Sequence, residues 1–456
     1  MSEFSVRDRQ AIVVGGARSG VAAALLLAGR GARVTLTDLR TRIDEAAALT
    51  DAGVRLVLGS HPPDMFIAAD LIVVSPGVPH SQAALVEARE RGVPVVGEIE
   101  LAFRWLKGRV IAITGTKGKS TTTALTGAIL EQAGCRVFVG GNIGLPLSGQ
   151  VDRSTPDSIH VVEVSSFQLE TVDTFHPWIA AMLNLTADHL DRHATYQEYT
   201  DAKARIFARQ TDQDWAVVNA DDPQTLDLAR RGRARQRLFA LHSPDADVTI
   251  ADSWVVERGA MGDLPLVRTS DVRLMGPHLM ADVLAAAAIT RLAGAEPAHI
   301  AAAVAAFRGL EHAMEWVDQI DDVRYVNDSK ATNIDSARQA IDTFGDGLVV
   351  VMGGRYKGGD FASLRDSLAA RRATVVAIGE ARSLIRDALG AVVTLVEANS
   401  MTEAVDAAAT AAKPGGTVLL APACASFDMF VDYAARGRAF KAEVARLRQG
   451  VKRGSA

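Results

Sequence analysis

The sequence predicts an α/β protein that contains more than one domain. Short runs of β-branched and aliphatic residues alternate with alanine- and leucine-rich stretches of helical length, which is typical of parallel sheets covered by helices. Many of the β-rich runs are continuously apolar rather than alternating, as buried parallel strands are. At about 150 residues per domain, the 456 residues correspond to about three domains. We place the domains at residues 1–97, 98–309 and 310–456.

Composition and charge exclude several classes of protein. Hydrophobic residues make up 48% and charged residues 23%, which is close to the globular average and excludes a disordered chain. Lys and Arg total 49 against 54 Asp and Glu, so the formal charge of −5 lacks the basic excess of a general nucleic-acid binder. Cys135 and Cys424 form no CxxC pattern, which fits a reducing cytoplasm. No apolar run reaches the ~18 residues that span a bilayer, so we expect a cytoplasmic protein without membrane contacts.

The first domain begins with a strand, a glycine-rich turn and a helix. Strands are predicted at residues 11–15, 33–37 and 71–75, and a helix at 20–30. In the turn Gly15-Gly-Ala-Arg-Ser-Gly20, glycines would let a diphosphate approach the helix N-terminus, and Asp38 ends the next strand. Because Ala17 replaces the usual second glycine, three interpretations stay open: a nicotinamide site, diphosphate binding without redox chemistry, and a plain tight turn.

A sharper motif lies near the start of the second domain. A predicted strand at 109–114 and a helix at 120–133 flank the loop Thr114-Gly-Thr-Lys-Gly-Lys-Ser-Thr121. Its backbone N–H groups would surround a phosphate, Lys119 would supply a point charge, and Ser120 would supply a hydroxyl ligand for Mg²⁺. The loop is a shortened form, because the full pattern wants a glycine at Ile113. A solvated Gly/Lys turn is the plain alternative, and the flanking strand and helix argue against it.

Two polar segments follow strands of the same domain. Glu163 lies in a strand predicted at 159–164, beside the phosphate loop, where a carboxylate can hold Mg²⁺; a buried or capping glutamate is the plain alternative. After a strand predicted at 179–185, the segment up to residue 193 is dense in Asp and His. Its spacing does not suit zinc, and an Mg²⁺ site with His189 as an additional ligand fits it better.

The α/β pattern continues to the end of the chain. The second domain adds predicted helices at 196–209, 281–293 and 299–307, and a less readable β segment at 245–273. The third domain has predicted strands at 323–326, 348–352, 373–378 and 417–421, and a final helix that runs into the basic residues 441–453.

Three polar or glycine-rich turns follow strands of the third domain, at residues 327–333, 353–359 and 422–428. Each turn alone could be an ordinary loop. Open α/β sheets bind ligands at the carboxyl ends of their strands, so we expect these turns to form one site.

The chain resembles the Mur ligase family, in its D-glutamate-adding branch, along all three domains. The resemblance implies a Rossmann-like N-terminal domain, a central P-loop ATPase-like domain with a parallel sheet, and a Rossmann-like C-terminal domain. The most specific segments are Gly115-Thr-Lys-Gly-Lys-Ser-Thr121, Gly141-Asn-Ile-Gly144, Glu163-Val-Ser-Ser-Phe-Gln-Leu-Glu170, Asp188-His-Leu-Asp-Arg192, Asn327-Asp-Ser-Lys-Ala-Thr-Asn333 and Pro422-Ala-Cys-Ala-Ser426.

The resemblance implies that the protein joins D-glutamate to UDP-N-acetylmuramoyl-L-alanine, with ATP, in peptidoglycan precursor synthesis. The carboxylate of the UDP substrate would attack the γ-phosphate of ATP, and the amine of glutamate would displace phosphate from the resulting acyl phosphate. Catalysis would depend on positioning and charge neutralisation. The implied cofactors are ATP, two Mg²⁺ ions and a carbamylated lysine, and a monomer acting on small molecules is expected.

The resemblance also assigns roles to residues. Those implied to be catalytic are Lys119, Glu163, His189 and Lys203, and the implied metal ligands are Ser120, Glu163, His189 and Lys203 in carbamylated form. ATP would contact Gly115, Thr116, Lys117, Gly118, Lys119, Ser120, Thr121, His278, Asp282 and Asp328. The UDP substrate would contact Arg18, Ser19, Asp38, Arg40, Ser75, Pro76, Gly77, Asn142 and Ser165. The amino acid would contact Lys330, Thr332, Lys357, Ser426, Phe427 and Tyr433. Without the resemblance, the charged helix around Lys203 predicts that it is a surface residue.

Two departures from the family pattern bear on the use of ATP. The family usually has Asn, which serves the adenine, at the positions of Leu279 and Asp282. An Arg that reaches the ATP phosphates is expected where Ala313 stands, and losing its charge-assisted hydrogen bond costs about 1.5–3 kcal/mol. Arg308 or Arg355 could compensate.

Three functional hypotheses follow. The first is a working ligase, for D-glutamate or for a different amino acid. The second is a degenerate paralogue that binds the UDP substrate with weak or no ATP-dependent catalysis. The third is an oxidoreductase that uses the first domain for NAD, and it leaves the phosphate loop unexplained.

Overall fold

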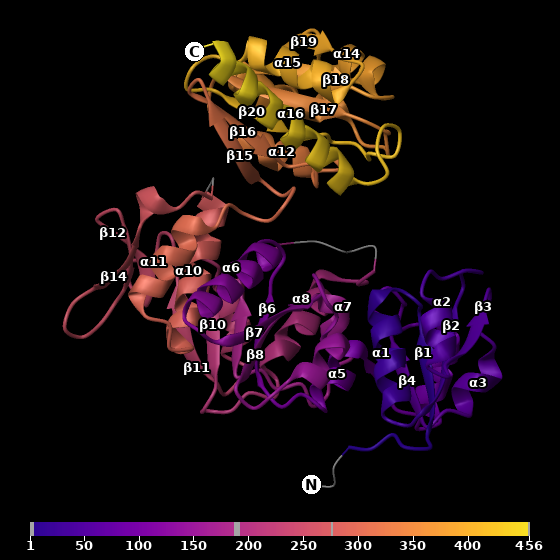
Figure 1. Cartoon of the computed structure of the whole chain (residues 1–456). Coiled ribbons are helices and arrows are strands. Elements are labelled where there is room, and N and C mark those ends of the chain that lie inside the picture. Colours follow the sequence, from indigo (N-terminus) through magenta and orange to yellow (C-terminus); the bar gives the residue numbers. More distant parts are fainter. Residues whose placement is uncertain (1–3, 187–191, 275–276, 455–456) are drawn as a thin grey trace. The chain divides into compact units, whose positions relative to one another are not determined.

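The computed structural model describes residues 4–186, 192–274 and 277–454 (Figure 1). The chain divides into two compact units, of which the first comprises residues 1–272 and 281–305 and the second comprises 273–280 and 306–456. The first unit contains a five-stranded and a nine-stranded sheet, and the second contains a six-stranded sheet. Within the described residues, no helix is long and apolar enough to cross a membrane.

The five-stranded sheet is entirely parallel, with the order β3-β2-β1-β4-β5. The helices α1 and α2 pack on one face, and α3 and α4 pack on the other. Both faces are therefore covered, which explains the continuously apolar strands. The strands are β1 (Gln10–Val14), β2 (Arg33–Asp38), β3 (Arg55–Leu58), β4 (Leu71–Val74) and β5 (Val95–Gly97), and the helices are α1 (Arg18–Gly29), α2 (Ala46–Asp51), α3 (Pro63–Ile67) and α4 (Ala83–Glu90).

The nine-stranded sheet has the order β14-β13-β12-β11-β10-β9-β6-β8-β7. It is parallel from β7 to β12, and β13 and β14 add an antiparallel hairpin at one edge. The strands are β6 (Arg109–Thr114), β7 (Arg136–Gly141), β8 (Ser158–Glu163), β9 (Ile179–Met182), β10 (Trp215–Asn219), β11 (Arg235–Phe239), β12 (Val248–Ala251), β13 (Trp254–Glu257) and β14 (Leu264–Arg268). The helices are α5 (Glu98–Phe103), α6 (Lys119–Gln132), α7 (Ser166–Leu169), α8 (Tyr196–Ala204), α9 (Pro223–Ala229), α10 (Pro277–Leu292) and α11 (Pro297–Ala306).

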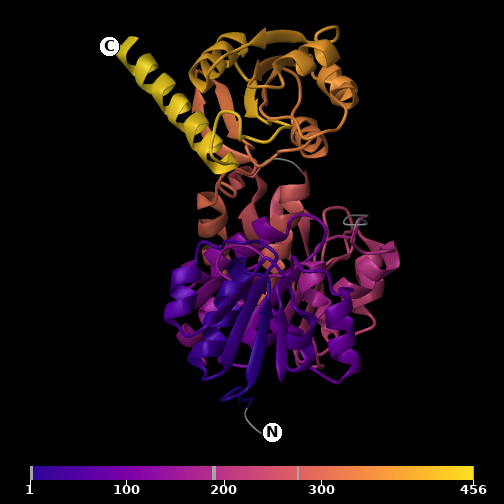
Figure 2. The ribbon, with the colours of Figure 1, turned by 90° about the vertical axis from the view of Figure 1, so that its right-hand side faces the viewer.

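The six-stranded sheet of the second unit has the order β15-β16-β20-β17-β18-β19 and is parallel except for β15. The helices α12, α13 and α14 cover one face, and α15 and α16 cover the other. Figure 2 shows α16, in yellow, extending beyond the sheet of this unit. The strands are β15 (Glu315–Ile320), β16 (Val323–Asn327), β17 (Leu348–Gly353), β18 (Thr374–Ile378), β19 (Thr394–Glu397) and β20 (Thr417–Leu420), and the helices are α12 (Ile334–Asp342), α13 (Arg365–Ala370), α14 (Arg382–Leu389), α15 (Met401–Ala411) and α16 (Tyr433–Gly454).

The α/β class is confirmed, and most of the predicted elements lie within a few residues of their predicted positions. The β segment expected at 245–273 forms β12, β13 and β14. Two predicted elements are too long. The strand predicted at 179–185 ends at Met182, because the chain then turns to contact the phosphate loop through Asn184. The helix predicted at 196–209 ends at Ala204 and continues as a 3₁₀ turn over Arg205–Phe207.

Candidate functional site

A cavity of about 400 Å³ lies at the carboxyl ends of β1, β2 and β4, in the first unit. It brings together all of the residues predicted to bind the UDP substrate except Ser165, which instead caps α7 through the N–H of Gln168. The cavity is lined by Gly15, Ala17, Arg18, Ser19, Asp38, Arg40, Ser75, Pro76, Gly77, Val78, Gly141, Asn142, Pro146 and Gln168.

The turn after β1 explains why Ala17 can replace a glycine. Ala17 is the N-cap of α1 and has φ −80°, an ordinary value for a residue with a Cβ atom. Gly20 is the position where no side chain fits, because a Cβ there would collide with the carbonyl oxygen of Gly15. The close approach of α1 to β1 therefore depends on Gly20. The backbone beside the cavity forms the predicted strand, tight turn and helix.

Asp38 and Arg40 form a bidentate ion pair at the edge of this cavity. The Arg40 Nη2 lies 2.8 Å from Asp38 Oδ2, and the N–H of Gly16 donates to the same oxygen at 2.6 Å. The hydrogen bonds from Arg40 hold the pKa of the Asp38 carboxyl group well below its usual range. Because the Arg40 side chain is 55% exposed, its guanidinium is accessible to a ligand while Asp38 orients it.

The phosphate loop lies between β6 and α6. Gly118 caps α6 in the left-handed conformation, at φ +81°, and Lys119 Nζ donates to the carbonyl oxygen of Thr116 at 2.7 Å. Asn184, which follows β9, braces the loop: its Oδ1 accepts the N–H of Lys117 at 2.8 Å, and its Nδ2 donates back to the Lys117 carbonyl at 3.1 Å. Asn184 therefore occupies the N–H groups of Thr116 and Lys117, and the N–H groups that remain to face a phosphate are those at the start of α6.

Asp282, in α10, lies directly against this loop. Its side chain is 3% exposed, and a Cβ on Gly118 would collide with its Oδ1. Burial raises the pKa of the Asp282 carboxyl group well above its usual value, and Lys119 and Thr122 oppose that rise. Its Oδ2 has no hydrogen-bond partner among the described residues. The residue predicted to serve the adenine thus contacts the phosphate loop itself.

Glu163 ends β8, which is next to β6 in the sheet. The side chain is 1% exposed; Oε1 accepts a hydrogen bond from Asn142 Nδ2 at 2.7 Å, and Oε2 has no partner among the described residues. A buried carboxylate oxygen with a free acceptor position beside a phosphate loop fits an Mg²⁺ ligand. No group of three or more His, Cys, Asp or Glu suited to a metal gathers in the described part of the chain, and the predicted ligand His189 lies outside it.

Lys203 is buried, at 2% exposure, so its interpretation as a surface residue is wrong. Its Nζ donates to the carbonyl oxygen of Gly115 at 2.8 Å and lies 4.8 Å from the centre of the Tyr199 ring. Tyr199 in turn shares a 2.8 Å hydrogen bond with the hydroxyl of Thr116. The helix α8 therefore places Lys203 directly behind the phosphate loop.

In the second unit, the three predicted turns leave the adjacent strands β16, β20 and β17. They are hydrogen-bonded to one another: Arg355 N–H donates to Ala425 O at 2.9 Å, Ala425 N–H donates to Arg355 O at 3.0 Å, and Ala423 N–H donates to Ala331 O at 2.9 Å. The residues predicted to contact the amino acid lie on these turns and at the start of α16. Of these, Lys330, Lys357, Phe427 and Tyr433 are exposed, Thr332 is half-buried and Ser426 is buried.

Two predicted ATP contacts belong to the second unit. Burial raises the pKa of Asp328 to about 6, and its Oδ1 accepts the N–H of Met314 at 3.1 Å. The side chain of His278 lies outside the described residues.

The structure adds residues that sequence reasoning missed. Gln168 lines the cavity of the first unit with a buried Nε2 that has no partner among the described residues, while its Oε1 accepts the Ser165 N–H at 2.9 Å. The Ser-x-x-Gln spacing of a capping box was the available signal for this residue. Asn184 gave no signal for its contact with the phosphate loop, because that contact joins segments far apart in the sequence.

Family profiles match each part of the chain. "Mur ligase MurD-like, N-terminal domain" matches residues 9–97, "Mur ligase middle domain" matches 113–290, and "Mur ligase, glutamate ligase domain" matches 312–424. In fold, the chain is similar to the crystal structure of UDP-N-acetylmuramate-alanine ligase MurC from Thermotoga maritima, with a TM-score of 0.58 and 18% identity over 97% of this chain and 100% of that one.

Curated relatives match nearly the whole length. A UDP-N-acetylmuramoylalanine–D-glutamate ligase of Acidobacterium capsulatum is 44% identical over 96% of both chains. One of Solibacter usitatus is 45% identical over 95% of this chain and 96% of its own. With the phosphate loop, the cavity of the first unit and the three joined turns in place, these matches show that the chain belongs to the Mur ligase family.

Proposed function

We propose that the protein is an ATP-dependent ligase that adds D-glutamate to UDP-N-acetylmuramoyl-L-alanine in peptidoglycan precursor synthesis. The names of its relatives suggest this reaction. The observation that carries the proposal is the 2.7 Å hydrogen bond between Asn142 and Glu163. Asn142 lines the cavity that we propose for the UDP substrate, and Glu163 ends the strand beside the phosphate loop, so the bond supports a reaction between ligands of these two regions.

In the proposed reaction, a carboxylate oxygen of the UDP substrate attacks the γ-phosphorus of ATP, and the bond to the bridging oxygen of ADP breaks. The glutamate amine then attacks the acyl carbon, phosphate leaves with the bonding electron pair, and the amine loses a proton. Lys119 and the N–H groups at the start of α6 bind the phosphates, and Arg40 contacts the uridine end. This chain's contribution is to orient two anions and offset their repulsion.

The chemistry of the family uses Mg²⁺, which when bound neutralises phosphate charge. We assign Ser120 and Glu163 to one Mg²⁺ and Lys203, as a carbamate, with His189 to a second. Carbamylation would convert a buried ammonium behind the phosphate loop into an anionic oxygen ligand. With ¹³C-labelled bicarbonate, a carbamate carbonyl resonance is expected in the NMR spectrum of the wild-type protein and not of Lys203→Arg. The same resonance in both proteins would refute the assignment.

The three sequence domains receive separate ligands in this proposal. Residues 1–97 take the UDP substrate, 98–309 take ATP and Mg²⁺, and 310–456 take the amino acid. In the last domain, Lys330 and Lys357 supply positive charge for the carboxylates of glutamate, and Thr332, Ser426, Phe427 and Tyr433 shape the pocket. ATP and a UDP-sugar as substrates favour a cytoplasmic location. We also propose that the protein is a monomer, which light scattering would test.

The function is tested by phosphate release. The purified protein with UDP-N-acetylmuramoyl-L-alanine, Mg²⁺ and ATP is given D-glutamate, L-glutamate or D-aspartate in parallel. Release that depends on D-glutamate and exceeds release with the other two is the expected result. Release above the control without amino acid only for L-glutamate or D-aspartate would assign a different ligase, and no release with any would refute the proposal.

A second candidate is a paralogue with weak ATP-dependent catalysis. It is favoured by the buried acid Asp282 against the phosphate loop, together with Leu279 and Ala313 at positions where the resemblance leads us to expect ATP contacts. Calorimetry separates the two candidates, because the paralogue should bind the UDP substrate without measurable binding of ATP.

A further inference from the structure

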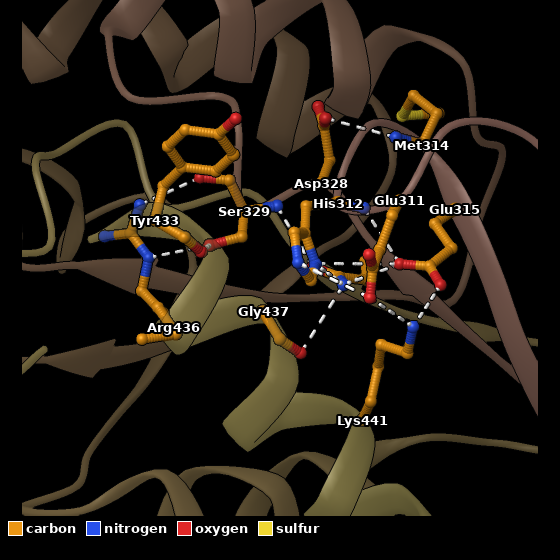
Figure 3. Close-up of polar contacts among 12 residues, drawn as sticks. Glu311, His312, Met314, Glu315, Asp328, Ser329, Tyr433, Arg436, Gly437 and Lys441 are labelled. Carbon is orange, nitrogen blue, oxygen red and sulfur yellow. Dashed lines mark hydrogen bonds and ion pairs between the residues drawn. The ribbon is translucent and has the colours of Figure 1, made fainter. Parts of the chain in front are cut away.

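The first turn of α16 carries a buried cation behind the amino-acid turns of the second unit. Arg436 is 1% exposed, and its guanidinium makes three hydrogen bonds. Nε donates to Ser329 Oγ at 2.9 Å, Nη2 donates to the Ser329 carbonyl oxygen at 2.9 Å, and Nη1 donates to the Cys424 carbonyl oxygen at 3.1 Å. Figure 3 shows the Arg436 side chain rising from α16 toward Ser329.

These bonds join the turns that carry the proposed amino-acid contacts. Ser329 precedes Lys330, and Cys424 lies two residues before Ser426. The Ser329 hydroxyl also donates to the Tyr433 carbonyl oxygen at 2.8 Å, which connects the start of α16 to the same point (Figure 3). The turn after β17 lies close too, since a Cβ on Gly354 would be 3.2 Å from Arg436 Nη1. One side chain therefore bonds to two of the three turns and approaches the third.

The cost of burying the Arg436 guanidinium argues against a role in packing alone. All three hydrogen bonds go to neutral oxygen atoms, and burial lowers the pKa of Arg436 to about 10, despite the nearby Asp428. A buried cation without a bonded carboxylate is costly, and an apolar side chain would fill the space at less cost. The turn it supports is also strained, because Ala423 has φ +56°. Such a conformation persists only where its surroundings hold it.

We propose that Arg436 is a positioning residue for the amino-acid site, holding the turns of Lys330 and Ser426 in register and adding positive charge behind a pocket for a dicarboxylate. The inference rests on the proposed function, since it takes these turns to be the glutamate site. It concerns a residue that touches no substrate and acts through Ser329 and Cys424.

The experiment compares three variants of the full chain with the wild type. Arg436→Met removes the charge and the donors, Arg436→Lys keeps the charge, and Ser329→Ala removes the hydroxyl that Arg436 contacts. Lys441→Met is the matched control, because Lys441 fastens the same helix through Glu311 and Glu315 without bonding to the amino-acid turns. For each protein, kcat, the KM of all three substrates and the melting temperature are measured.

Arg436→Met is expected to raise the KM for D-glutamate by about 10- to 100-fold, because small misplacements of a site cost that much. The KM values for ATP and the UDP substrate should change less than about two-fold, within the range of surface substitutions. Arg436→Lys should recover part of the loss. Ser329→Ala should also raise the KM for D-glutamate, because it removes the hydroxyl that accepts from Arg436 Nε and donates to the Tyr433 carbonyl oxygen. Lys441→Met should lower the melting temperature without raising the KM for D-glutamate selectively.

Three results would overturn the inference: an unchanged KM for D-glutamate in Arg436→Met, an equal rise in all three KM values, or the same selective rise in Lys441→Met. If Arg436→Met shows no melting transition, Arg436→Lys and Ser329→Ala decide by the same criteria. A wild-type protein that releases no phosphate refutes the proposed function, and the inference falls with it. If the wild-type protein is active and the variants show no selective rise in the KM for D-glutamate, the inference is refuted and the proposed function stands.

Discussion

At the scale of single residues, Asp282 shows how exchanging an amide for a carboxylate changes the charge of a site. The family resemblance leads us to expect Asn here, and a carboxylate differs from the amide in charge but hardly in size. Because the side chain is buried against Gly118, that charge lies under the phosphate loop, where ATP would bring further negative charge. Its raised pKa means that the group ionises only at higher pH than an ordinary Asp.

Asp282→Asn is therefore expected to lower the KM for ATP. The reduction should be about 3- to 10-fold and should grow as pH rises, because only the ionised carboxylate repels the phosphates. Initial rates over a range of ATP concentrations, at several pH values, give the measurement. Asp227→Asn, at an exposed position of α9, serves as the control. A KM for ATP that is unchanged or higher at every pH would contradict the explanation.

At the scale of elements, α5 fastens two loops of the nine-stranded sheet with buried acids. Glu100 is 0% exposed and accepts the N–H groups of Asp173, Thr174 and Phe175 at 2.9, 2.9 and 3.0 Å. Glu98 accepts the N–H of Ser148 at 2.6 Å, and its Oε2 has no partner among the described residues. Hydrogen bonds thus offset the cost of burying the Glu100 carboxylate but only part of that cost for Glu98. Burial raises the pKa of Glu98 to about 7.

Glu98→Gln is expected to stabilise the protein at pH 8 but not at pH 4.5. In the unfolded chain the Glu98 pKa is near 4.5, and in the folded protein it is about 7. Between these values the unfolded state is ionised while the folded state keeps its proton, so the free energy of unfolding falls as pH rises through this window. Glutamine removes that loss, which is about 1–3 kcal/mol at pH 8.

Urea unfolding of wild type and Glu98→Gln at both pH values provides the measurement. Glu87→Gln, at an exposed position of α4, is the control and should behave as the wild type. Equal gains at pH 4.5 and pH 8, or a loss at pH 8, would contradict the origin assigned to the effect.

At the scale of the whole molecule, the proposed ligands are divided between the two units. The first unit contains the cavity of about 400 Å³ and the phosphate loop, and the second contains the joined turns. Substitutions in different units should therefore affect different substrates. We expect this separation because the cations assigned to the ligands are individual side chains rather than a general positive field.

Arg40→Ala should raise the KM for the UDP substrate, and Lys357→Ala should raise the KM for glutamate, each by about 10- to 100-fold, the cost of a lost charged hydrogen bond. Each variant should leave the other KM within about two-fold. Steady-state kinetics in all three substrates measures the division. Lys413→Ala, at an exposed position of the second unit, is the control. Crossed effects, with Arg40→Ala acting on glutamate, would contradict the division of ligands.

The sequence by itself determined the α/β class, the phosphate loop and the turns after the strands, because these depend on contiguous residues. Gly118 with its positive φ is one such local requirement. Only the tertiary structure placed Asp282 under the loop, Gln168 in the cavity and Arg436 behind the turns. These contacts join segments far apart in the sequence, and a buried polar side chain has no periodic or motif signal until its partners are known. For Lys203, too, only the tertiary structure showed that the side chain is buried against the phosphate loop.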